Sequence, residues 1–226
     1  MIRRLGPALS CLLLLAAGPA HAQDSRLAPY LAARDQGAVG AVQGQSQAEP
    51  LKLGAAPRPL AGVSLDLLPW SDEIAEKLDA VKARARDSIK RFIGVGDELA
   101  RLRADYDAEL ARAGGAGLAR RGVTDASGDV LFADVPEGRW LLLGRRVEAQ
   151  TPPKPAKTIR RESGLYTEGP KEVGHSSVWM WRMDVTVRAG ESTRVRLTDR
   201  NLWLSLVEPT RTPPPDLPPG TGQRRR

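Results

Sequence analysis

The sequence predicts a mainly β protein, an antiparallel β-sandwich of about seven strands with an inserted α-helical hairpin. Three observations lead to this prediction. Short segments that alternate apolar and polar residues recur along the chain, which is typical of half-buried strands. Turn-forming clusters of Gly, Pro and Asp separate these segments. Between two of them the apolar residues change to steps of three and four, which is typical of an amphipathic helix.

Residues 1–22 have the pattern of a secretory signal peptide. Arg3 and Arg4 precede an apolar run, and the segment closes on Ala20-His21-Ala22. The run is shorter than the roughly 20 residues that a membrane-spanning helix needs, and no later segment reaches that length. We therefore expect cleavage after Ala22, a secreted or periplasmic protein and no transmembrane segment. A retained membrane anchor and lipidation at Cys11 are the less favoured alternatives.

Cleavage would remove the only cysteine and leave His175 as the only histidine. Cys/His zinc sites and Cys–His nucleophile pairs would then be excluded. A lone histidine at a loop–strand junction is expected to be solvated. Asp125, Ser127 and Asp129 alternate like the start of a calcium loop, but the following glycine and distant glutamate are missing, so a hairpin turn is favoured. We predict no catalytic residue, no metal and no cofactor, and hence no enzyme. An envelope hydrolase that uses carboxylates alone is the least favoured alternative, because no two carboxylates are convincingly paired.

The sandwich is predicted over residues 39–207, after a linker of residues 23–38 that contains either a short helix or no regular structure. Weak alternation over residues 39–48 predicts an edge strand. The alternation over residues 60–68 is stronger, because Val63, Leu65 and Leu67 fall on one face. Pro69 is expected to end that strand.

The helical hairpin is predicted over residues 71–115. The first helix is expected over residues 71–93, and its apolar stripe is Ile74, Leu78, Val81, Ala85, Ile89 and Phe92. Gly94-Val95-Gly96 is expected to break it before a second helix, whose stripe is Leu99, Leu102, Tyr106 and Leu110. Three arrangements remain open: the helices pair with each other as a solvated arm, which is favoured, the arm pairs with another chain, or the hairpin packs on the sandwich. The predicted partner-binding residues are the charged Glu76, Arg86, Arg101 and Asp105.

The strands are expected to resume near Arg120. Residues 125–128 form a turn, residues 135–138 form a corner, and the almost wholly apolar run 140–143 predicts a central strand. Residues 150–174 form a polar, basic loop excursion. Further strands are expected at residues 178–188 and 193–197, joined by Ala189-Gly190-Glu191, and at residues 202–206. Residues 208–226 are expected to be a disordered tail rich in Pro and Arg.

Several of these segments resemble one family. The pattern T-D-x-x-G-x-V-x-F-x-x-V-P-x-G-x-W-x-L from Thr124 to Leu142 is similar to the repeat T-D-x-x-G-x-F-x-F-x-x-L-P-x-G-x-Y-x-L of carboxypeptidase regulatory-like domains, also called prealbumin-like or transthyretin-like domains. Residues 59–65 resemble the second strand of that family, and residues 185–197 resemble its closing hairpin. The resemblance implies a prealbumin-like sandwich that acts as a non-catalytic accessory or ligand-binding module, in a fold class often grouped with carbohydrate-binding-like folds.

Tryptophan and basic residues suggest possible ligands. The chain has five Trp against two Phe and three Tyr. Trp203 is expected to face away from Leu202 and Leu204, as an exposed platform for a sugar ring or a partner. Trp179 and Trp181 lie on the more apolar face of their strand, which favours the core over a ligand site. The net charge of +7 would suit nucleic acid, but a secreted chain rarely meets it. An anionic cell-wall polymer or lipid head group is the alternative ligand of the basic excursion and tail, although a solvated charged segment without a ligand is favoured for each.

These observations predict a non-catalytic interaction module of the cell envelope. It would contact an envelope protein or a second copy of itself through the helical hairpin and loops. The alternative is a sandwich that binds a glycan or cell-wall polymer.

Overall fold

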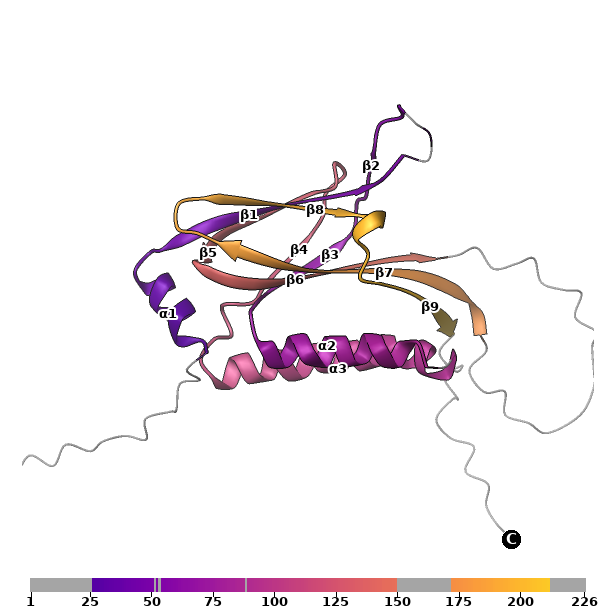
Figure 1. Ribbon diagram of the computed structural model, residues 1–226, viewed down its shortest axis with the longest axis horizontal. Coiled ribbons are helices and arrows are strands. Elements are labelled where there is room, and N and C mark those ends of the chain that lie inside the picture. Colours follow the sequence, from indigo (N-terminus) through magenta and orange to yellow (C-terminus); the bar gives the residue numbers. More distant parts are fainter. Residues whose placement is uncertain (1–25, 51, 53, 88, 150–171, 212–226) are drawn as a thin grey trace, which may run out of the picture.

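The computed structural model describes residues 26–50, 52, 54–87, 89–149 and 172–211. It contains two β-sheets that face each other and a helical hairpin that covers the outer face of the larger sheet (Figure 1). The strands are β1 (Val39–Ala48), β2 (Arg58–Pro59), β3 (Ser64–Pro69), β4 (Arg120–Val123), β5 (Asp129–Pro136), β6 (Gly138–Ala149), β7 (Glu172–Val187), β8 (Ser192–Thr198) and β9 (Leu204–Arg211). The helices are α1 (Ala28–Asp35), α2 (Asp72–Ala85), α3 (Ile89–Arg112) and the 3-10 turn η1 (Asp199–Asn201). The predicted fold class, a mainly β sandwich with an inserted hairpin, is confirmed.

The larger sheet is antiparallel throughout and has the order β4-β3-β6-β7-β9, so β6 is central as predicted. In the smaller sheet β1 pairs antiparallel with β2 and β5 and parallel with β8. The prediction that residues 39–48 form an edge strand was therefore wrong. The small residues that weaken the alternation there are needed for packing: a Cβ at Gly44 would lie 2.7 Å from the Val130 side chain.

The core between the sheets contains the completely buried Trp140 and Trp181. Trp181 Nε1 donates a hydrogen bond to the backbone oxygen of Thr198 at 2.7 Å, which links β7 in the larger sheet to the end of β8 in the smaller one. Trp140 Nε1 donates to the backbone oxygen of Pro136 at 2.9 Å. Both indole donors are thus satisfied inside the core, as buried polar groups generally are.

Two turns that were expected to close hairpins instead join the two sheets. Residues 125–128 connect β4 of the larger sheet to β5 of the smaller one, and residues 189–191 connect β7 to β8 in the same way. Asp125 Oδ1 accepts hydrogen bonds from the backbone N–H groups of Ser127 (2.8 Å) and Asp129 (2.9 Å). This is a side-chain-stabilised turn, which accounts for the alternating oxygen-bearing residues without a calcium ion.

The hairpin bends earlier than predicted. The helix α2 ends at Ala85, and α3 runs through Gly94 and Gly96, so the two helices have 14 and 24 residues, or lengths of about 21 and 36 Å. A glycine inside a helix costs about 1 kcal/mol relative to alanine. That cost is outweighed here because Val95, only 1% exposed, continues the buried stripe of Leu99, Tyr106 and Leu110.

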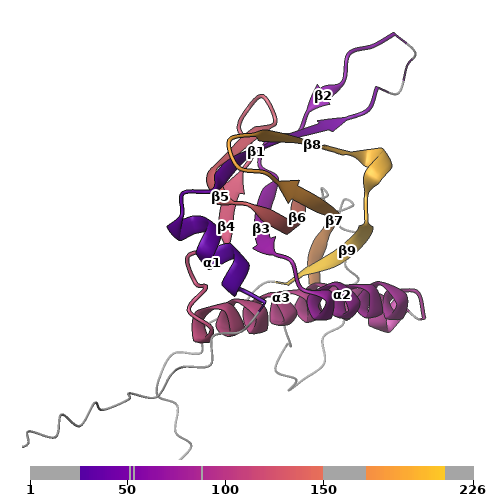
Figure 2. The ribbon, with the colours of Figure 1, turned by 60° about the vertical axis from the view of Figure 1, so that its left-hand side comes forward.

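The hairpin lies along the outer face of the larger sheet (Figure 2). Ile74, Leu78 and Val81 of α2 are buried there, and the sheet contributes the buried Leu68 and Leu141. The sequence left open whether the hairpin packs on itself, on the sandwich or on another chain; in the structure it packs on the sandwich. The apolar run at residues 140–143 is explained in the same way, because the central strands are covered on both faces.

Three predicted segments fall wholly or partly outside the described residues. The signal peptide at residues 1–22 does, and so do residues 150–171 of the basic excursion; β7 already begins at Glu172. The tail was predicted from residue 208, but residues 208–211 pair with β7 as part of β9, and the remainder lies outside the described residues.

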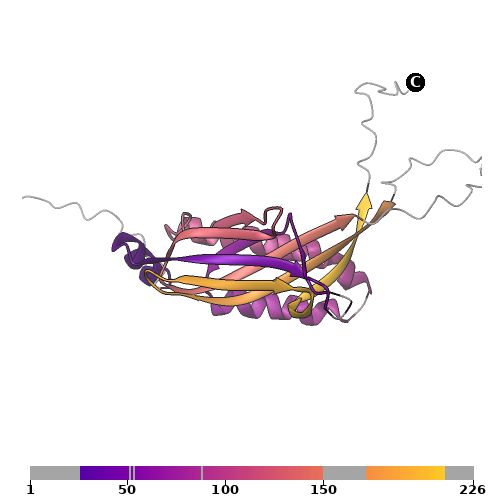
Figure 3. The same ribbon diagram turned by 90° about the horizontal axis from the view of Figure 1, so that it is seen from above.

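Figure 3 shows the strands from above, with the hairpin beneath them. Within the described residues, no helix combines the length and apolarity needed to span a membrane.

Candidate functional site: a cavity between the hairpin and the larger sheet

A cavity of about 600 Å³ lies between the hairpin and the outer face of the larger sheet. This volume is within the range of roughly 300–1,000 Å³ that is typical of small-molecule sites. Its apolar lining consists of Ile74 and Leu78 from α2, Ile93, Leu99 and Leu102 from α3, and Leu143, Met180 and Trp203 from the sheet side. The two layers meet elsewhere through buried side chains, so the cavity is a local gap in their packing.

One edge of the cavity is an ion pair between two strands. Arg145 of β6 and Glu208 of β9 lie 3.1 Å apart, measured from Nη2 to Oε2. The Glu208 carboxylate also lies against the backbone of α3 at Gly96, where an added Cβ would overlap Oε1. The exposed Asp97 lines the same part of the cavity. This edge therefore offers both a cation and carboxylates to a polar group.

A second charged group borders the cavity at Arg103 of α3. Its Nη1 lies 2.5 Å from Asp66 Oδ2, and its Nε donates to Asp107 Oδ1 at 3.2 Å. Asp107 also pairs with Arg121 of β4 at 2.5 Å. Arg103 Nη2 is buried and has no hydrogen-bond partner within the described part of the chain. An unsatisfied buried donor costs about 1–3 kcal/mol, so a ligand acceptor that reached this group would be stabilised.

Trp203 forms part of the cavity wall. It is partly buried, its backbone N–H donates to the Met180 oxygen at 2.9 Å, and Lys82 Nζ lies 5.6 Å from its ring centroid. The expectation of a freely exposed Trp203 platform was therefore wrong. Trp203 lies in the connection between η1 and β9, so the alternation of a strand does not decide which way its side chain points.

The other two candidate tryptophans lie elsewhere. Trp181 is 0% exposed and belongs to the core between the sheets, so it cannot contact a ligand in the folded protein. Trp179 is partly buried, and the Arg146 guanidinium lies 5.0 Å from its ring centroid. The three tryptophans therefore do not form one site.

The four charged residues proposed for partner contacts are all exposed on the hairpin, and none lines the cavity. They are Glu76, Arg86, Arg101 and Asp105. The charged residues that do border it were not among the predicted site residues; they are Asp66, Asp97, Arg103, Arg145 and Glu208. The only signal was the apolar run at residues 140–143, which already indicated a second buried face for the central strand.

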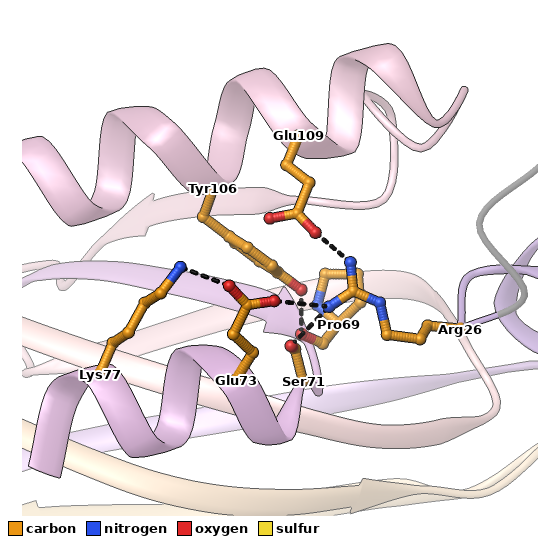
Figure 4. A network of polar contacts seen from close by, with 7 residues as sticks. All are labelled: Arg26, Pro69, Ser71, Glu73, Lys77, Tyr106 and Glu109. Carbon is orange, nitrogen blue, oxygen red and sulfur yellow. Dashed lines mark hydrogen bonds and ion pairs between the residues drawn. The ribbon is translucent and has the colours of Figure 1, made fainter.

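A polar network holds the hairpin at the N-terminus of α2 (Figure 4). Arg26 Nη1 donates to Ser71 Oγ at 2.8 Å, and Arg26 also pairs with Glu109 of α3. Lys77 pairs with Glu73 at 2.5 Å, and this hydrogen bond raises the pKa of the Lys77 ammonium. The segment before α1 is thus tied to both helices. The Tyr106 hydroxyl of α3 donates to the backbone oxygen of Pro69 in β3 at 2.7 Å, which links the hairpin to the larger sheet at the same end.

Comparisons with known proteins give only distant likenesses. No protein-family model and no curated protein matches the sequence. One similar solved structure is a candidate carbohydrate-binding protein from Pseudomonas aeruginosa, with 15% identity and a TM-score of 0.38 over 75% of this chain and 94% of that one. Another is a minor pilin of Streptococcus agalactiae, with 14% identity and a TM-score of 0.29 over 80% of this chain. The match spans 48% of the pilin's length. At these TM-scores neither structure informs the function of this chain.

Proposed function

We propose that the protein is a non-catalytic binding module of the cell envelope, and that the cavity between the hairpin and the larger sheet holds its ligand. The single observation that carries this proposal is the cavity itself: about 600 Å³ with a mainly apolar lining and charged edges. Such a lining suits an amphiphile, a small molecule with an apolar body and a polar end.

The lining suggests how an amphiphile would lie. Its apolar body would contact Leu78, Leu99 and Leu143, where water is poorly accommodated. Its polar end would lie at the edge formed by Arg145 and Glu208. Arg145 is 48% exposed there, so a polar group could pair with it without being fully desolvated.

The location and the lack of catalysis rest on the sequence. The pattern of residues 1–22 supports secretion or a periplasmic location. The resemblance to carboxypeptidase regulatory-like domains and the single histidine outside residues 1–22 support a module without catalytic residues.

A contact with an envelope protein or a second copy remains the second candidate function. Because the apolar stripes of the hairpin are buried against the sheet, such a partner would bind the charged outward face at Glu76, Arg86, Arg101 and Asp105. A glycan site at Trp203 is less favoured, because the ring is partly buried and lies beside Lys82.

Filling the cavity tests the proposal. Leu143→Trp would place a larger side chain into the cavity, and Leu131→Trp is the matched control, because Leu131 is 60% exposed on the smaller sheet. The probe is 11-(dansylamino)undecanoic acid, whose fluorescence rises in an apolar site. We expect saturable one-to-one binding, at least tenfold weaker in Leu143→Trp and unchanged in Leu131→Trp. Wild-type affinity in Leu143→Trp, or no saturable binding to the wild-type protein, would contradict the proposal.

A further inference from the structure

The outer face of the smaller sheet carries four long polar side chains side by side. Gln43 and Gln45 come from β1, and Arg194 and Arg196 come from β8. The parallel register pairs Gln43 with Arg194 and Gln45 with Arg196. All four are exposed, whereas the alternate residues Val42, Val195 and Leu197 are buried towards the core. The four side chains therefore share the face that points away from the larger sheet.

Strand geometry fixes the spacing of this group, which we call the Gln–Arg surface. Neighbouring strands lie about 4.8 Å apart, and residues two apart on one strand are separated by about 6.6 Å. The four side chains thus occupy the corners of a small rectangle. A shallow depression of about 500 Å³ lies here, lined by the same four residues with Gly44, Asp129 and Val195.

The two arginines of the Gln–Arg surface differ from three arginines of the larger sheet, which have carboxylate partners. Arg139, Arg145 and Arg182 pair with carboxylates at 2.7, 3.1 and 2.5 Å. Within the described residues, neither Arg194 nor Arg196 forms an ion pair. Asp129 lies on β5, on the other side of β1, and lines the same depression, but it makes no ion pair with either arginine. Two guanidinium groups are therefore available on one surface.

We propose that the Gln–Arg surface binds an acidic polysaccharide. A guanidinium can hold a sugar carboxylate through two parallel hydrogen bonds. A glutamine amide both donates and accepts, which matches neighbouring sugar hydroxyl groups. This ligand and this surface are distinct from the amphiphile and its cavity, which lies on the far side of the larger sheet.

Other polyanions fit this surface less well. None of the seven residues that line the depression is aromatic, so nucleobases would have no ring to stack on. None of the same seven residues has a large apolar side chain that could insert into a lipid layer. Glutamines beside the two cations favour a ligand that offers hydroxyl groups as well as negative charge.

The test measures the affinity of the full chain for polygalacturonate, with neutral dextran as the uncharged comparison. Arg194→Gln/Arg196→Gln removes the two cations of the surface. Arg84→Gln/Arg112→Gln is the matched control, since it removes two exposed cations from the hairpin and so changes the net charge equally. We expect at least a tenfold loss of affinity in the first variant and less than a twofold loss in the second. Gln43→Val/Gln45→Val keeps the charge and is expected to weaken binding about threefold to tenfold, as the loss of one or two hydrogen bonds would.

Three results would overturn the proposal. Equal losses in the two arginine variants would indicate unspecific attraction to net positive charge. Inorganic polyphosphate bound as tightly as polygalacturonate, with no effect of the glutamine changes, would indicate a simple polyanion site. Phosphatidylglycerol vesicles bound in preference to the polysaccharide would indicate a membrane surface. Circular dichroism confirms folding of each variant, and probe binding in the cavity is expected to stay unchanged in all of them.

Discussion

Glu208 of β9 lies so close to Gly96 of α3 that a Cβ added at Gly96 would overlap the Glu208 carboxylate. The same carboxylate pairs with Arg145 of β6 at 3.1 Å. Gly96 therefore lies inside α3 and does not end a helix. Its missing side chain allows the hairpin and the sheet to approach each other closely at the edge of the cavity. Substitutions at Gly96 and Glu208 can therefore measure the coupling energy between the hairpin and the larger sheet.

We expect Gly96→Ala and Glu208→Ala to be non-additive. In the Glu208→Ala background the alanine meets no carboxylate, so it should stabilise the protein by about 1 kcal/mol through helix propensity. In the wild-type background the new alanine side chain must displace Glu208 from Arg145. An exposed ion pair of this kind contributes about 0–1 kcal/mol, so most of the stabilisation by the alanine should be lost. Urea unfolding of the four proteins of the cycle measures the difference. Equal effects of Gly96→Ala in both backgrounds would mean that Glu208 does not restrain α3.

Two glycines with similar backbone angles are expected to respond differently to alanine. Gly128 and Gly190 have φ values of 78° and 73°. A Cβ at Gly190 meets nothing within 4 Å, whereas one at Gly128 would overlap the backbone oxygen of Ser46. Gly190→Ala should therefore lower the free energy of unfolding by about 1–2 kcal/mol, which is the cost of holding a non-glycine residue in the left-handed conformation. Gly128→Ala should cost about 1–3 kcal/mol more, because β1 must move.

Thermal unfolding of both variants gives the comparison, with Gly190→Ala as the control for backbone strain alone. A melting temperature for Gly128→Ala that matches that of Gly190→Ala would show that the turn can shift away from β1 without cost.

The Tyr30 hydroxyl makes stability sensitive to alkaline pH. It donates to the backbone oxygen of Arg139 and accepts from the Trp70 N–H at 3.1 Å. Burial raises the pKa of the Tyr30 phenol above its ordinary value of 10.0, although the Trp70 hydrogen bond and the Arg139 charge oppose this. The pKa of Tyr30 is higher in the folded protein than in the unfolded chain. The contribution of the Tyr30 hydroxyl to the free energy of unfolding is therefore complete below about pH 10 and is lost as the pH rises through the folded pKa.

Tyr30→Phe tests this prediction. At pH 8 it should lower the free energy of unfolding by about 1–2 kcal/mol, because the Arg139 oxygen and the Trp70 N–H lose their partner. Between pH 10 and pH 11 it should lose stability less steeply than the wild-type protein. Urea unfolding at these pH values measures both, and identical slopes in the two proteins would contradict the assignment to Tyr30.

Prediction from sequence succeeded where local signals decide structure. The alternation of Val63, Leu65 and Leu67 gave the buried face of β3, and Trp140 was correctly expected in a central strand. It failed at the hairpin bend, because propensity favours a break at Gly94 and Gly96 while the buried Val95 favours continued helix. It also failed for Trp203, whose position depends on Met180 and Lys82, far away in the sequence.

The sequence by itself determined the fold class, the two amphipathic helices and most strand positions, because period and turn chemistry are local properties of the chain. Tertiary structure alone decided which strands share a sheet, that the hairpin covers the larger sheet, and that Arg145 and Glu208 meet beside Gly96. The physical reason is that an apolar stripe specifies burial without specifying a partner. The cavity exists only because two layers, each predictable from sequence, leave part of their facing surfaces unfilled.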